Sequence, residues 1–399
     1  MRREGVDPRL ARRALRYAAL TAALSAAAPA GGGVLGENVD AHASVGMLKD
    51  DNMFRRDFDV RDETRLRAQA GVEALLEIGR QSLRLDALAH DNRFENTSEL
   101  DYVGSAGSLT LDWEAGRRLD GTLAYLYSDD LTSFNQLRRI EKDITTIEDA
   151  RAEAGFFLTP RLQVRGDVRA VQWRHSAPAW RSSELDETHY GASLMLRTAA
   201  DNFIGIGTTR IDGEYPNRFF GPGSIADNAY EQIASVLIVE WSSGGKTSFD
   251  MRVGHTSREQ EHLSGRDFDA VTGGIAFEYA PSPKTTLSVA WSRDIRSIDE
   301  AVARAALVDR IDVTPSWQVS PNVLISARAT YRQQDFIGLE AVPDEGRVDE
   351  ELHVETQVLY SLGSRYSLEV AVGRGARDST RRGLDYDYLY GNVGVRVTF

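Results

Sequence analysis

The sequence contains no cysteine, and no stretch beyond its first thirty residues approaches twenty consecutive apolar residues. The first absence excludes disulfide bonds and a lipid-modified cysteine. The second excludes helical membrane spans, which need about 20 apolar residues in a row. Basic residues are also scarce relative to acidic ones, with 47 Lys and Arg against 60 Asp and Glu and a formal net charge of −13. This balance argues against a nucleic-acid partner.

Residues 1–30 have the three parts of a secretory signal peptide. Six arginines lie in the first sixteen residues, an apolar run follows from Tyr17 to Ala28, and a small-x-small cleavage site ends at Ala30. The run is too short to span a bilayer, so it predicts a cleaved signal rather than an anchor. Its removal leaves 41 basic and 58 acidic residues, a net charge of −17. We expect a signal peptide at 1–30, a short linker at 31–37 and a single barrel over 38–399.

Short turn signals rich in Gly, Pro, Asn and Asp recur along the mature chain about every 40 residues. They are centred on Gly79, Gly116, Pro160, Asp201, Gly244, Ser282, Pro321 and Gly363. Between successive turns lie two alternating stretches and one longer polar stretch, so each repeat is a hairpin with one tight end and one loose end. A membrane barrel has this asymmetry. A β-propeller has a similar period, but each blade has four strands and a blade motif, and this repeat has neither.

The repeat predicts an all-β fold, a transmembrane antiparallel up-and-down β-barrel of about 18 strands, with 16 as the alternative. The strands are expected at 38–48, 64–78, 82–92, 102–115, 121–129, 148–158, 161–173, 187–198, 202–212, 230–242, 246–257, 268–280, 284–294, 306–319, 322–333, 351–362, 365–375 and 386–399.

Alternation assigns the two faces of each strand. At the carboxyl terminus the apolar face comprises Val393, Val395, Val397 and Phe399, and the other face comprises Asn392, Gly394, Arg396 and Thr398. With no helix to pack on it, the apolar face can meet only lipid. The terminal Phe resembles the signal that the bacterial barrel-assembly machinery recognises, so this machinery is an expected partner. Aromatic residues fall near strand ends, where interfacial girdles lie: Trp113, Trp241, Phe277, Tyr279, Trp291, Trp317, Tyr360 and Tyr366.

The polar face carries charges of both signs and is predicted to line a lumen wide enough for water. The residues expected to line a transport path are Arg165, Arg169, Arg252, Arg310, Arg328, Arg332, Arg396, Asp167, Asp250, Asp312 and Glu355. Further basic residues assigned to this face include Arg65, Arg67 and Arg210. An arginine ladder would attract an anionic solute such as an acidic polysaccharide. The alternative is that these arginines pair with acidic neighbours across strands and hold the wall.

The long loops hold the acidic surplus, notably in 128–147 and 335–351. Their carboxylates would either bind divalent cations that bridge lipopolysaccharide or remain solvated. Inward folding of 128–147 and 336–350 would instead indicate a structural or adhesive barrel with a plugged lumen. The seven His residues are scattered, so we expect no metal site, no catalytic residue, no cofactor and no enzyme. An outer-membrane enzyme acting on lipid or polysaccharide stays an alternative, because barrels can carry active sites.

The first expected strand leads into Asp50-Asp51-Asn52-Met53-Phe54-Arg55. A strand followed by Asp-Asp-Asn-x-Phe-Arg resembles the start of the beta-barrel porin family found beside exopolysaccharide biosynthesis genes, the EpsL-like outer-membrane proteins. Length, signal peptide and closing Phe also match, so the resemblance spans nearly all of 38–399. It implies a porin or exporter in the Gram-negative outer membrane, among lipid and lipopolysaccharide, that moves an extracellular polysaccharide together with other secretion components. The resemblance brings no catalytic residues with it.

Overall fold

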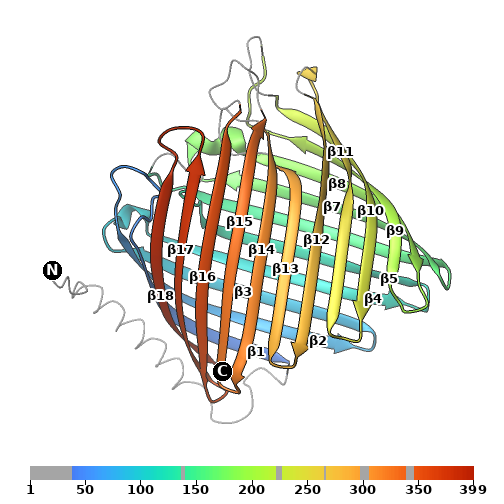
Figure 1. Cartoon of the computed structure of the whole chain (residues 1–399), viewed down its shortest axis with the longest axis horizontal. Coiled ribbons are helices and arrows are strands. Elements are labelled where there is room, and N and C mark those ends of the chain that lie inside the picture. Colours follow the sequence, from blue (N-terminus) through green and yellow to red (C-terminus); the bar gives the residue numbers. More distant parts are fainter. Residues whose placement is uncertain (1–37, 136–139, 222–226, 265–266, 297–304, 338–345) are drawn as a thin grey trace.

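The computed structural model describes residues 38–135, 140–221, 227–264, 267–296, 305–337 and 346–399. They form one closed antiparallel sheet of 18 strands (Figure 1). The strands are β1 (Val39–Asp50), β2 (Glu63–Ile78), β3 (Gln81–Phe94), β4 (Tyr102–Ala115), β5 (Leu119–Leu131), β6 (Ile144–Thr159), β7 (Leu162–His175), β8 (Leu185–Arg197), β9 (Phe203–Glu214), β10 (Ala229–Ser243), β11 (Thr247–Gln260), β12 (Phe268–Ser282), β13 (Thr285–Arg296), β14 (Ala305–Ser320), β15 (Val323–Ile337), β16 (Val348–Leu362), β17 (Tyr366–Ser379) and β18 (Tyr386–Thr398).

Each strand pairs with its neighbours in the chain, and β1 also pairs with β18 from His42↔Thr398 to Asp50↔Tyr390. This seam closes the sheet and removes both free edges, which would otherwise recruit another chain. The predicted fold class and strand count are therefore confirmed. The signal peptide and linker expected at 1–37 lie outside the described residues and stay predictions.

Short turns join the strands at one end of the barrel and longer segments join them at the other (Figure 1). Gly116 and Gly363 in the short turns have φ of +69° and +68°, a conformation that glycine adopts without steric cost. At the other end, η1 (Ser98–Leu100) and η2 (Pro178–Ser183) are brief 3-10 helices. No helix in the described segments is long and apolar enough to cross a membrane.

The observed strands are mostly longer than expected at their loop ends. β6 begins at Ile144, four residues before the predicted start at 148, because the run Ile144-Thr145-Thr146-Ile147 is β-branched and continues the pairing with β5. The sequence signal weakens there because the alternation of apolar and charged residues does not extend to the loop end.

Residues paired directly across neighbouring strands share a face, so the register carries the inside and outside assignment around the barrel. Val393 and Val395 of β18 are 40% and 43% exposed on the outer face, next to Met47 and Val45 of β1. The eight aromatic residues expected in a girdle are also on outward positions, mostly close to the short turns: Trp113, Trp241, Phe277, Tyr279, Trp291, Trp317, Tyr360 and Tyr366. The outer surface is thus an apolar band with an aromatic border, as lipid requires.

Candidate functional site

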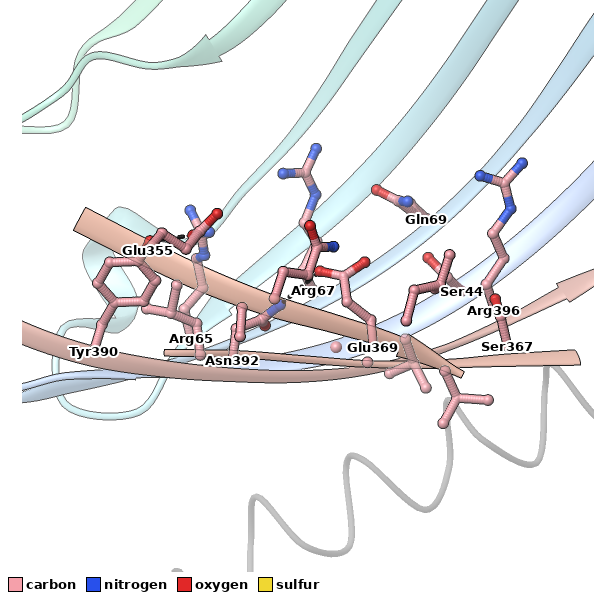
Figure 2. Close-up of a pocket in the computed structure, with 18 of the residues that line it drawn as sticks. Ser44, Arg65, Arg67, Gln69, Glu355, Ser367, Glu369, Tyr390, Asn392 and Arg396 are labelled. Atoms are coloured by element: carbon pink, nitrogen blue, oxygen red, sulfur yellow. Dashed lines mark hydrogen bonds between the residues drawn. The ribbon is translucent and has the colours of Figure 1, made fainter. Parts of the chain in front are cut away.

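A groove of about 860 Å³ follows the inner wall where β16, β17 and β18 meet β1 and β2. Its lining extends from Arg55 and Tyr388 near the long loops to Arg365 and Thr398 at the short-turn end. The groove therefore passes along the full length of this wall. Figure 2 shows side chains from these neighbouring strands projecting into a common space inside the barrel.

One side of the groove is basic. Arg65, Arg67 and Gln69 occupy alternate positions of β2 and point into the lumen (Figure 2). The Nε atoms of Arg65 and Arg67 are buried and have no hydrogen-bond partner within the described chain. Neither guanidinium lies within 4.0 Å of a carboxylate of that part of the chain. Two like charges are thus held side by side with no carboxylate of the described segments in contact.

Two carboxylates whose charges act on Arg65, those of Asp50 and Asp130, are already hydrogen-bonded to other side chains. Asp50 accepts hydrogen bonds from the Nη1 and Nη2 atoms of Arg55 at 2.9 and 2.8 Å. Asp130 accepts a hydrogen bond from the hydroxyl of Tyr102. The guanidinium groups of Arg65 and Arg67 therefore face the lumen without a direct ion pair to a described carboxylate of the wall.

On the other side of β1, Tyr388 of β18 lies flat along the same wall. A Cβ atom placed on Gly375 of β17 would lie 2.5 Å from the ring of Tyr388, so this glycine leaves the space that the ring occupies. The Tyr388 hydroxyl reaches Nδ1 of His353 on β16 at 2.9 Å. The side chain thus bridges three strands, with one ring face against the backbone and the other toward the interior.

Tyr390 repeats this arrangement two residues further along β18. A Cβ atom placed on Gly373 of β17 would lie 2.5 Å from the Tyr390 ring, so the ring covers this glycine. The Tyr390 hydroxyl donates a hydrogen bond to Glu355 of β16. The ring centroids of Tyr388 and Tyr390 are 6.2 Å apart with an interplanar angle of 20°. Arg55 packs 3.5 Å above the Tyr388 ring. The rings therefore form a nearly continuous flat surface on this wall.

The segment between β1 and β2 is fixed to the barrel seam by the motif that begins at Asp50. The Asp51 carboxylate accepts a hydrogen bond from the Leu389 amide at 2.7 Å. The Asn52 side chain donates to the carbonyl oxygen of Asp387 at 2.8 Å. The motif thus has a structural role, because it anchors this loop to β18 where the first and last strands meet.

Two loops fold inward over the upper part of the groove. Phe54, from the β1–β2 loop, is 2% exposed and meets Phe134, from the β5–β6 loop, at 4.9 Å between ring centroids. The carbonyl oxygen of Asn135 accepts a hydrogen bond of 3.0 Å from Nη1 of Arg377 on β17. Because β17 and β5 are six strands apart around the barrel, the loop crosses a chord of the interior. The loop expected at 128–147 therefore folds inward in its described part.

A buried carboxylate anchors the base of the β5–β6 loop. Asp143 accepts hydrogen bonds from the Thr132 hydroxyl at 2.7 Å and the Ala177 amide at 2.9 Å, and its Oδ2 lies 2.7 Å from Nδ1 of His175. Burial alone would raise the pKa of Asp143, but the hydrogen bonds from His175, Ala177 and Thr132 together hold that pKa below its usual value. The charged carboxylate therefore ties this loop to the one between β7 and β8.

The register places all eleven residues expected along a transport path on inward positions: Arg165, Arg169, Arg252, Arg310, Arg328, Arg332, Arg396, Asp167, Asp250, Asp312 and Glu355. Glu355 and Arg396 line the groove, and Arg169, Arg252 and Asp250 line a recess of about 970 Å³ on the opposite wall. The structure does not bring the eleven into one cluster. Their role in transport stays a prediction.

Most of these arginines are neutralised. Five form ion pairs with lumen carboxylates: Arg165 with Glu240, Arg169 with Asp149, Arg310 with Asp312, Arg332 with Glu351, and Arg396 with Glu73. For these five, pairing with acidic neighbours describes the wall better than a free arginine ladder. No group of three or more potential metal ligands occurs within the described segments.

The inward assignment of Arg210 is wrong. This residue lies on the outer face of β9, on the same side as Ile204 and Ile206, and pairs with Asp212 and Glu231. The strand continues beyond its apolar positions, and there the outer face becomes charged. A charge therefore identifies the inner face only within the apolar band.

Residues 239–399 match the model of the family described as "Putative beta-barrel porin 2". The structure of OpdK from Pseudomonas aeruginosa, solved with vanillate, is 14% identical, covers 91% of this chain and 99% of its own, and gives a TM-score of 0.48. A BenF-like porin from Pseudomonas fluorescens Pf-5 is 10% identical, with coverages of 91% and 99% and a TM-score of 0.46. No curated protein matches the sequence. The carboxyl-terminal part of this chain is thus similar in sequence to β-barrel porins.

Proposed function

We propose that this protein is an outer-membrane porin that passes hydrophilic solutes along the groove beside the β18–β1 seam. The observation that carries the proposal is the combination of a lipid-compatible outer face with a polar groove that runs the length of the inner wall. An 18-strand barrel is wide enough to leave an aqueous path. The inward loops narrow this path near the long-loop end and so would limit the size of the solute.

Reconstitution of the refolded protein into planar bilayers tests this proposal. We expect stepwise single-channel currents in symmetric KCl, and uptake of small sugars into liposomes that contain the protein. Absence of both, with the barrel shown to be folded by its circular dichroism, would overturn the proposal. This fold check matters because an unfolded barrel would also give no current.

We further propose an extracellular polysaccharide as the physiological cargo, which is what the sequence resemblance implies. The flat ring of Tyr390 supports this choice, since sugar rings present apolar faces that pack on aromatic rings. The neighbouring Tyr388 ring is covered by Arg55. The amount of polymer secreted by a strain that lacks the gene should be lower than in wild type, and it should recover when the intact gene is supplied. Normal secretion in the deletion strain would contradict a polysaccharide cargo and leave the porin proposal intact.

A further inference from the structure

We propose that Arg65 and Arg67 form an oxyanion-binding site in the lumen, which selects solutes that carry a carboxylate or a phosphate group. This inference rests on the proposed porin function for its physiological meaning. The binding itself depends only on the folded barrel.

Neither guanidinium group has a carboxylate in contact within the described chain. Buried polar groups in proteins almost always have a hydrogen-bond partner, and an exception calls for an explanation such as an absent ligand. The Nε atoms of both arginines are such exceptions in the described chain, while five other lumen arginines have carboxylate partners. The wall therefore neutralises five of its arginines and leaves Arg65 and Arg67 without a carboxylate contact in the described chain.

The wall beside the pair contains two glycines at the level of Arg67. Arg67 stands opposite Gly46 of β1, which in turn stands opposite Gly394 of β18. Gly46 and Gly394 place no side chain beside Arg67 on the β1–β18 side of this row, so a recess opens there. Arg65 and Gln69 flank it on β2 (Figure 2). A small oxyanion thus has room to reach the planar guanidinium forks, which bind carboxylate and phosphate in a bidentate manner.

Polar side chains of β17 and β18 lie beside the pair on the same inner wall, across β1. Asn392 and Glu369 project into the same space as the two arginines (Figure 2), and both line the groove. The Asn392 amide nitrogen donates a hydrogen bond of 3.3 Å to Glu369 and keeps a second hydrogen for a solute. The oxygens of both side chains can accept hydrogen bonds from hydroxyl groups of a solute. The site therefore fits a hydroxylated oxyanion, such as an acidic or phosphorylated sugar, better than a bare inorganic ion.

The test compares three probes that share one sugar ring: glucose, glucuronate and glucose 6-phosphate. Binding to the folded protein in detergent is measured by calorimetry at about 0.1 M salt, where screening already acts over about 10 Å. Block of the single-channel current by the same probes is measured in parallel. We expect glucuronate or glucose 6-phosphate to bind and block, and glucose to do so at least tenfold more weakly. The tighter of the two anions assigns the carboxylate or the phosphate as the preferred group.

An Arg65→Gln/Arg67→Gln variant should lose at least tenfold in affinity for the anions, about 1.4 kcal/mol. Arg210→Gln is the matched control, since it removes a positive charge from the outer face and should leave binding unchanged. An Arg65→Lys/Arg67→Lys variant keeps the charge but loses the planar fork, and weaker binding than wild type supports the bidentate geometry. Heat-modifiable migration on gels verifies that each variant is folded.

Unchanged anion affinity in the folded Gln variant, or equal binding of glucose and the anions by wild type, would overturn the site. Lys variants that bind the anions as tightly as wild type would overturn it as well. The outcomes separate the two proposals. Binding without conductance would refute the porin and keep the site, whereas conductance without anion preference would refute the site and keep the porin.

Discussion

Replacement of Phe54 by alanine should open the channel. The side chain is 2% exposed and belongs to a buried cluster with Phe94, Leu100, Tyr102 and Phe134. Truncation of a buried phenylalanine costs about 3–5 kcal/mol, of which the edge-to-face contact accounts for about 0.5–1.5 kcal/mol. This cost falls on the docking of the loops rather than on the strand ladder, so the barrel should stay closed. The ratio of undocked to docked loops should rise about 100-fold or more, at about 1.4 kcal/mol per factor of ten.

Single-channel recording measures the consequence directly. Phe54→Ala should show a larger mean conductance and more current noise than wild type, because the loops leave the mouth of the groove more often. Phe58→Ala is the control, since Phe58 belongs to the same loop but is 63% exposed and should have little effect. Trypsin should also cut the Phe54→Ala loop faster at its arginines. Equal conductance and equal cleavage in the two variants would refute the inward docking.

Three further outcomes are expected. Hydrogen bonds lower the pKa of Asp143, so the stability that this carboxylate confers is fully present above the unfolded carboxylate pKa of about 4. That stability is lost as the pH falls through the lower pKa of the folded state. Current noise from loop motion in bilayer recordings should therefore increase only below about pH 4. Gly375→Val should push the Tyr388 ring off the wall and lower the urea midpoint of the folded barrel, whereas Gly166→Val, which meets little but solvent or lipid, should not. Asp50→Asn should destabilise the barrel by about 3–5 kcal/mol in urea unfolding, because it removes one partner of a largely buried ion pair.

The barrel was predictable from the sequence because its two signals are local. Turn residues such as Gly116 and Gly363 mark the tight ends, and the period of two assigns a face to each residue between them. Even the strand count follows, since the closing strand shows the same alternation as the rest. The predicted strand boundaries at the loop ends were less accurate, as at Ile144, because strand pairing continues where the bilayer no longer imposes alternation.

The site was harder to predict because its chemistry depends on which side chains meet across strands. Arg165 of β7 pairs with Glu240 of β10, three strands away, and no spacing in the sequence indicates that contact. That Arg65 and Arg67 contact no carboxylate of the described residues is likewise visible only when every neighbouring strand is in place. The tyrosine surface had a weak signal, namely tyrosines at alternate positions of the last strand and glycines at alternate positions of the strand before it. That pattern was missed.

The central claim, that the polar face of the wall lines a conducting path and the other face meets lipid, can be tested at four consecutive residues of β18. Because the chain has no cysteine, single substitutions of Asn392, Val393, Gly394 and Val395 by cysteine give unambiguous labelling sites. A charged, membrane-impermeant thiol reagent should reduce the single-channel current at 392 and 394 and leave it unchanged at 393 and 395. Current reduction at all four positions, at none, or only at 393 and 395 would contradict the account.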